Sequence, residues 1–196
     1  MKRVLTVLGL LIIAPALWAD QHRAIVQVEA DLPYDQSWEL LQDFSLAHNY
    51  VPGLSSTEIV SAARSGLGAH RRVYDAEGDY LEETITSWRE GQGFTLDLHE
   101  GDEPMAPFEQ IEFIYTVAPV AGNSTQIQLE LAFRMPWGWL GDTLAEWIIL
   151  PIMEDSLVQI AAGMKYFYET GVPATDEDRE NGAAAVQIIT AAAEAP

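Results

Sequence analysis

Residues 142–171 read DTLAEWIILPIMEDSLVQIAAGMKYFYETG, and this stretch decides the fold. Apolar side chains recur in it at steps of four, three, four and three residues, which is the spacing of one face of a helix. The members of that face are Met153, Leu157, Ile160, Met164 and Phe167. We therefore expect a helix from about Asp142 to Glu169. At about 28 residues it would span about 42 Å, which is enough to cross a whole sheet.

The two ends of this helix carry recognisable signals. Thr143 and Glu146 have the spacing of a capping box at the start, and Gly171 followed by Pro173 is typical of a helix end. Pro151 falls inside the predicted helix. Because proline has no backbone N–H, we expect a kink there.

Upstream of this helix, apolar and polar residues alternate with the period of two that is typical of half-buried strands. The expected strands are 22–30, 57–63, 69–74, 80–89, 94–99, 111–117 and 127–133. After the first strand, Pro33 suits the first turn of a helix whose apolar side is Trp38, Leu41 and Phe44. A second short helical turn is expected after Gly53. Short turns join the later strands, so they should pair antiparallel.

The order of elements predicts an α+β helix-grip fold. A seven-stranded curved antiparallel sheet would wrap around the long C-terminal helix, with two short helices after the first strand. This packing leaves a gap, lined by apolar side chains from both layers. Its expected lining is Phe113, Tyr115, Leu129, Leu131, Phe133, Trp147, Leu150, Met153, Leu157, Ile160 and Met164. The gap is either a ligand cavity or a filled, dry core.

Two charged side chains should point into the same gap. Alternation places Arg71 and Glu83 on the inner faces of adjacent strands, with His70 and Tyr74 on the other face. A buried unpaired charge is very costly, so Arg71 and Glu83 must pair. Either they form a polar handle or an acid–base pair for a ligand, or they form an ion pair that braces two strands.

Other site chemistry is not indicated. The chain has no cysteine, which excludes disulfides and thiolate metal sites. Its histidines are scattered without the spacing of a zinc site. No glycine-rich phosphate loop and no nucleophile elbow is present. We expect neither a metal nor a cofactor.

The two ends of the chain are expected to lie outside the folded domain. Residues 1–19 have the basic start, apolar run and small-residue cleavage site of a signal peptide, which predicts a secreted or periplasmic protein. An uncleaved membrane anchor is the alternative. The domain would then cover residues 20–171, and the acidic, alanine-rich residues 172–196 would be a mostly disordered tail.

The charge limits the possible partners. The net charge is −20, and without Lys2 and Arg3 it becomes −22, from 8 basic and 30 acidic residues. Such a surface repels phosphate backbones, so nucleic acid is a poor partner. Trp137 and Trp139, just before the long helix, could make transient contact with a membrane or pack on their own domain. The sequence does not indicate an oligomeric state.

Several local motifs occur in an order that matches one known superfamily. They are Leu32–Phe44 (LPYDQSWELLQDF), Tyr50–Gly53 (YVPG), Gly66–Arg71 (GLGAHR) and Leu81–Ile85 (LEETI). Over residues 22–170 the chain resembles the START-like, SRPBCC or birch-pollen-allergen-like superfamily, most of all its polyketide cyclase/dehydrase and lipid transport group. The resemblance implies a hydrophobic-ligand pocket but no single reaction, because members bind, carry, cyclise or dehydrate. A secretion signal departs from the many cytoplasmic members.

Three functions follow as hypotheses. The first is a secreted or periplasmic protein that binds or transfers a lipid-like or aromatic, polyketide-like molecule. The second is a cyclase or dehydratase that acts on such a ligand, with Glu83 as acid or base and Arg71 orienting a carbonyl. The third is a non-catalytic module whose acidic surface binds a partner.

Overall fold

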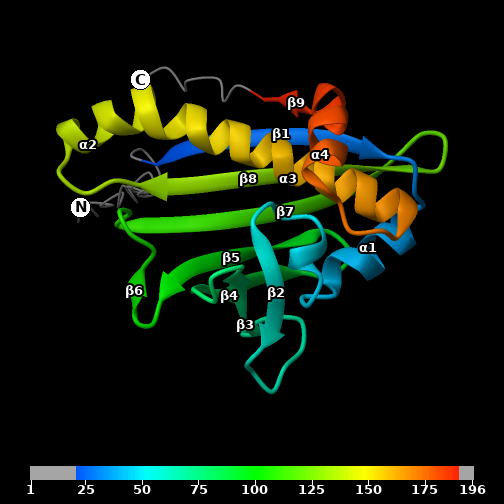
Figure 1. Ribbon diagram of the computed structural model, residues 1–196, viewed down its shortest axis with the longest axis horizontal. Helices are drawn as coiled ribbons and strands as arrows, with labels where there is room; N and C mark the ends of the chain where they lie inside the picture. Colours follow the sequence, from blue (N-terminus) through cyan, green and yellow to red (C-terminus); the bar gives the residue numbers. More distant parts are fainter. Residues whose placement is uncertain (1–20, 190–196) are drawn as a thin grey trace, which may run out of the picture.

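The computed structural model describes residues 21–189, and the expected signal peptide lies outside this part. Figure 1 shows a broad antiparallel sheet with one long helix lying along it. The sheet has nine strands in the order β2-β3-β4-β5-β7-β8-β1-β9, with β6 paired to β5. The predicted α+β helix-grip fold is therefore confirmed, with two short extra strands.

Seven longer strands form most of the sheet. They are β1 (His22–Ala30), β2 (Leu54–Ile59), β3 (His70–Asp75), β4 (Tyr80–Arg89), β5 (Gly93–Glu100), β7 (Gln110–Val120) and β8 (Ser124–Arg134). The expected strand at 57–63 begins three residues earlier and ends earlier. The loop expected around residues 101–108 contains β6 (Glu103–Pro104), which pairs with the end of β5.

The alternation in the sequence sets the faces of the sheet. In β7, every second residue from Ile111 to Val117 is buried, while its neighbours are partly exposed. Gly93 starts β5 at φ +148°, and a Cβ on it would lie 1.9 Å from the carbonyl oxygen of Tyr115. Only glycine allows β5 and β7 to approach this closely at that point.

Two short helices close one end of the sheet. α1 (Tyr34–Gln42) follows Pro33, as expected, and buries Trp38 and Leu41. The second helical element, η1 (Ala47–Asn49), comes before Tyr50 rather than after Gly53. The Tyr50–Gly53 motif therefore ends this turn instead of starting a new one.

The long helix begins earlier than its sequence signals suggested. It consists of α2 (Trp139–Leu144), a π-helical turn η2 (Ala145–Ile149) and α3 (Leu150–Thr170). The predicted capping box is wrong, because the Thr143 hydroxyl donates to the Trp139 carbonyl within the helix. The wide turn η2 lies immediately before Pro151, so the backbone is irregular where the proline predicted a kink. The helix ends at Gly171, at φ +71°, as expected.

α3 packs on β1 and β8 (Figure 1). Its fully buried positions Leu157, Ala161 and Met164 step by four and three residues, as a helix face requires. By length and composition the helix from Trp139 to Thr170 could cross a membrane, and a core helix passes the same test. Because α3 covers the sheet, we interpret it as a core helix.

The prediction of a disordered tail is wrong for residues 172–189. α4 (Asp176–Gly182) begins with a capping box from Thr175, and η3 (Ala183–Ala185) and β9 (Gln187–Ile188) follow it. β9 pairs with β1. Arg179 is buried and donates to the Ala174 carbonyl, the Ala174 N–H donates to the Asn49 carbonyl, and α4 packs on α3, so α4 has a fixed place on the domain. The sequence did not indicate this structure because the segment has no apolar stripe. A buried arginine and backbone pairing with β1 stabilise it instead.

Candidate functional site

A charged pair lies inside the apolar interior. β3 and β4 place Arg71 directly opposite Glu83. The Nε and Nη2 atoms of Arg71 both lie 2.5 Å from Oε2 of Glu83. The Arg71 side chain is 2% exposed and that of Glu83 is 12% exposed. The expectation that these two residues face inward and pair is therefore met in the structure.

Arg71 also contacts the segment between α1 and η1. Its Nη1 donates to the Phe44 carbonyl at 2.8 Å, and its guanidinium lies 4.0 Å from the centroid of the Phe44 ring. Burial alone would lower the pKa of Arg71, but Glu83, Tyr50 and Tyr115 raise it above the ordinary value. Arg71 is therefore a permanent cation in the interior.

Three tyrosines surround the pair or lie near it. They are Tyr50 after η1, Tyr115 on β7 and Tyr168 on α3, and all three are buried. Burial raises the pKa of Tyr50, and it raises those of Tyr115 and Tyr168 well above their usual range. All three are therefore neutral phenols at ordinary pH.

The Tyr168 hydroxyl is buried without a hydrogen-bond partner, as is the hydroxyl of Ser37 on α1. Tyr50 interacts with both Tyr115 and Arg71, and Tyr168 lies within the electrostatic reach of Tyr50. An unpaired buried hydroxyl costs free energy. The interior therefore holds donors that a bound oxygen atom would satisfy.

Sequence reasoning found Arg71, Glu83 and Tyr115 but missed Tyr50 and Tyr168. Tyr50 belongs to the Tyr50–Gly53 motif, where no alternation indicates which side chains point inward. Tyr168 comes directly after the last member of the predicted apolar face, Phe167. The one signal in the sequence was the expected burial of the Arg71 cation, because a buried cation favours polar aromatic neighbours such as tyrosine.

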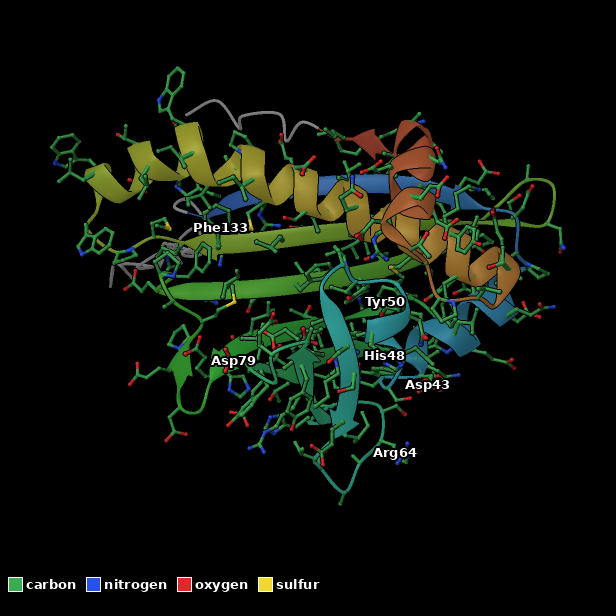
Figure 2. All side chains as sticks on the ribbon, in the orientation of Figure 1. Asp43, His48, Tyr50, Arg64, Asp79 and Phe133 are labelled. Carbon is green, nitrogen blue, oxygen red and sulfur yellow. The ribbon has the colours of Figure 1, made fainter. Side chains whose placement is uncertain are left out.

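The five sheet residues that were expected to line the gap are all buried: Phe113, Tyr115, Leu129, Leu131 and Phe133. In Figure 2, Tyr50 lies toward the α1 end of this interior and Phe133 toward the α2 end. From the helix, Leu157 and Met164 are fully buried, whereas Leu150, Met153 and Ile160 are partly exposed and pack against the core.

Trp147 is a correction. It is 78% exposed, so it points away from the sheet and lines no interior space. The π-helical turn η2 adds a residue to one helical turn, which shifts the positions before Leu150 relative to those after it. The regular spacing from which the sequence placed Trp147 does not hold across this turn.

The interior is closed around several of these side chains. Leu129, Phe133, Leu157 and Met164 are 0% exposed, so no water-sized space touches them. Along these residues the structure has the filled core that the sequence left as the alternative to a cavity. A ligand that reached them would have to displace side chains or lift the helix.

An open hollow of about 310 Å³ lies on the other face of the sheet. Its lining is Thr84, Thr86, Asp97, His99, Gly101, Asp102, Glu103 and Pro104. The His99 ring already bonds the Thr84 hydroxyl at 2.8 Å and the Gly101 carbonyl at 2.7 Å. This hollow is therefore separate from the Arg71–Glu83 pair and is not the predicted cavity.

His70 lies on the same outer face, as expected, beside Glu82 and His99. Burial lowers the pKa of His70, although the Glu82 carboxylate opposes this effect. Glu82 also binds Arg72 and accepts from the Gly101 N–H, and these contacts lower its pKa. Within residues 21–189, no three His, Cys, Asp or Glu side chains are grouped so as to hold a metal ion.

Solved structures with this architecture span most of the chain. A START superfamily protein from Mycobacterium smegmatis is 16% identical, with a TM-score of 0.58 over 77% of this chain and 99% of that one. The protein Ara h 8.0201 is 16% identical, with a TM-score of 0.55 over 76% and 97%. A protein from Thermus thermophilus is 20% identical, with a TM-score of 0.55 over 75% and 97%. At these identities the likeness establishes the fold alone.

Sequence comparison is more specific. No curated protein matches the chain significantly. The family model described as polyketide cyclase / dehydrase and lipid transport matches residues 21–165. This range runs from the start of β1 into α3, and it includes the Arg71–Glu83 pair with Tyr50 and Tyr115. The fold and the match over most of the described chain together establish that this protein belongs to the polyketide cyclase/dehydrase and lipid transport family.

Proposed function

We propose that the protein binds and transfers a hydrophobic small molecule, lipid-like or aromatic, between the inner face of the sheet and α3. The family supports a hydrophobic-ligand fold. The observation that carries the proposal is a polar cluster at one end of an otherwise apolar interior. Its members are Arg71, Glu83, Tyr50, Tyr115 and Tyr168. A ligand with an apolar body and one carbonyl or carboxyl group has the matching chemistry.

The cluster offers two kinds of contact to such a group. Arg71 supplies a fixed positive charge, and neutral tyrosine hydroxyls supply donors that need not lose a proton. The unpaired Tyr168 hydroxyl is the donor whose burial is unexplained without a ligand. In the unliganded protein Glu83 occupies Arg71, so a carboxylate ligand competes with Glu83, whereas a carbonyl need not.

The binding test uses fluorescent fatty-acid probes and native mass spectrometry of gently purified protein. We expect saturable probe binding at one site and a co-purified hydrophobic species. Tyr168→Phe should weaken binding of a carboxylate probe by about tenfold or more, because a charge-assisted hydrogen bond contributes about 1.5–3 kcal/mol. Tyr80→Phe, at a 49% exposed tyrosine on β4, is the matched control and should leave affinity unchanged. The absence of both saturable probe binding and a co-purified species would refute the proposal.

A cyclase or dehydratase is the second candidate, favoured by the direct contact of Glu83 with Arg71. In this role Arg71 polarises a carbonyl, and Glu83, which is nearer to solvent, moves a proton. Glu83→Gln should then abolish turnover of an aromatic polyketide-like substrate while ligand affinity stays nearly unchanged. If Glu83→Gln retained its turnover, Glu83 would not be the catalytic group.

We also propose that the protein is periplasmic or secreted, because residues 1–19 have the pattern of a cleaved signal. The mass of the protein recovered from the periplasmic fraction tests this. We expect a chain that begins at Asp20. Recovery of the uncut chain only from the cytoplasm would contradict it.

A further inference from the structure

Large apolar side chains are exposed on the N-terminal part of the long helix and the turn before it. They are Trp137, Trp139, Leu140, Trp147, Ile148 and Ile152, and each is between 51% and 78% exposed. We call these six residues the tryptophan patch. All lie within residues 137–152, on α2, η2, the start of α3 and the preceding turn. Figure 1 places α2 at the end of the helix opposite α1 and α4.

The patch is a second apolar surface and not part of the core. Between its members, Ala145 is fully buried against the domain, and Leu144 and Ile149 pack against the core. The helix therefore has apolar side chains on both its inner and its outer side here. Single exposed apolar residues are ordinary, but six large ones within residues 137–152 are typical of an interaction site.

The described chain begins at this same end of the molecule. The Nε2 atom of His22, at the start of β1, lies 3.3 Å from the Asp142 carboxylate on α2. The start of the described chain and α2 therefore lie side by side at this end of the molecule.

Charge decides which occupant fits. Residues 137–152 contain two acids, Asp142 and Glu146, and no lysine or arginine. An anionic bilayer would repel this surface. A second copy would also bring another chain of net charge −20 against it. Tryptophan instead favours the boundary between neutral headgroups and acyl chains, where the ring is buried and its N–H stays hydrated.

We propose that the tryptophan patch docks the protein on a lipid bilayer with zwitterionic headgroups. The helix lies against the surface and does not cross it, because the other side of α3 is fixed to β1 and β8. This docking goes beyond the proposed ligand binding and depends only on the outer face of the helix.

The absence of cysteine allows a direct test on the full chain. Single cysteines at Leu140 and at Ile152 carry an environment-sensitive fluorophore, and Leu67→Cys is the control because Leu67 is 69% exposed on the β2–β3 loop. With phosphatidylcholine vesicles we expect a blue shift at 140 and 152 but not at 67. Mixing phosphatidylglycerol into the vesicles should weaken the response.

A combined variant tests the energetics. Trp139→Ser with Trp147→Ser should reduce vesicle partitioning by roughly a hundredfold, since burial of each aromatic side chain contributes about a factor of ten. Both positions are exposed, so folding and probe binding without vesicles should be unchanged. Equal responses at 140, 152 and 67 would overturn the proposal. So would a blue shift without vesicles that grows with protein concentration, because it would identify a second copy as the occupant.

Discussion

The Arg71–Glu83 pair allows a prediction about stability. Two single variants should lose different amounts of unfolding free energy, and the double variant should lose almost none. Glu83→Leu leaves a guanidinium in the interior that is 2% exposed and cannot lose its proton. Breaking a buried pair from one side costs about 3–5 kcal/mol. For a domain of this size, about 2–4 °C per kcal/mol, the melting temperature should fall by roughly 6–20 °C.

Arg71→Met should cost less, and its cost should depend on pH. The Glu83 side chain left behind is 12% exposed and can take up a proton, which removes the unpaired charge. The penalty therefore falls on the ionised carboxylate alone, so this variant should lose stability as pH rises. Arg71→Met also leaves the Phe44 carbonyl without its donor, which adds about 1 kcal/mol at every pH.

The double variant Arg71→Met with Glu83→Leu removes both charges and leaves an apolar pair of similar volume. Its free energy of unfolding should lie within about 1–2 kcal/mol of wild type, because such replacements are often neutral or stabilising. Urea unfolding followed by circular dichroism, at about pH 5 and about pH 8, measures all four proteins. A Glu83→Leu variant that lost less than about 1 kcal/mol, or a double variant less stable than Glu83→Leu, would refute the reasoning.

Three further predictions concern stability. Gly163→Ala should cost about 1–3 kcal/mol of unfolding free energy in urea, because its Cβ would lie 2.4 Å from the Tyr50 carbonyl oxygen. The control Gly171→Ala meets no atom within 4 Å but has φ +71°, so it should cost less, about 1 kcal/mol. Equal costs for the two variants would exclude the steric explanation. Tyr168→Phe should stabilise the unliganded protein by about 1 kcal/mol, since it removes an unpaired buried hydroxyl, and a loss of stability would reveal a missed partner. Because burial raises the pKa values of Tyr115 and Tyr168 in the folded protein, their stabilising contribution is complete below about pH 10 and is lost as pH rises further; unfolding free energies across this range should fall less steeply in Tyr115→Phe.

The sequence predicted the fold well because the fold depends on periodic burial. Alternation along β7 and the helical spacing from Met153 to Phe167 are visible without any tertiary information. The same alternation placed Arg71 and Glu83 on one inner face, and cost alone required their pairing. These inferences need only the period of an element and the free energy of a buried charge.

The failures occurred where regular spacing or local composition stopped being informative. The π-helical turn η2 changed the direction of Trp147, because the regular helical period does not continue through a turn with an inserted residue. The segment 172–189 has the composition of a disordered tail, yet Arg179 and pairing with β1 fix it in place. The sequence could not predict that the Tyr168 hydroxyl lacks a hydrogen-bond partner, because this depends on which residues the fold brings close to it.

The two faces of the long helix connect the closed interior to the proposed bilayer. Its inner face covers the apolar side chains around the Arg71–Glu83 pair, and its outer face from Trp139 to Ile152 carries the tryptophan patch. Between them, the π-helical turn η2 interrupts the regular α-helical hydrogen bonds just before Pro151. A force that draws the patch toward a lipid surface therefore acts on the part of the helix that contacts the sheet least firmly. The free energy of docking would then offset the cost of opening the interior, and a hydrophobic ligand could pass between bilayer and protein without crossing water.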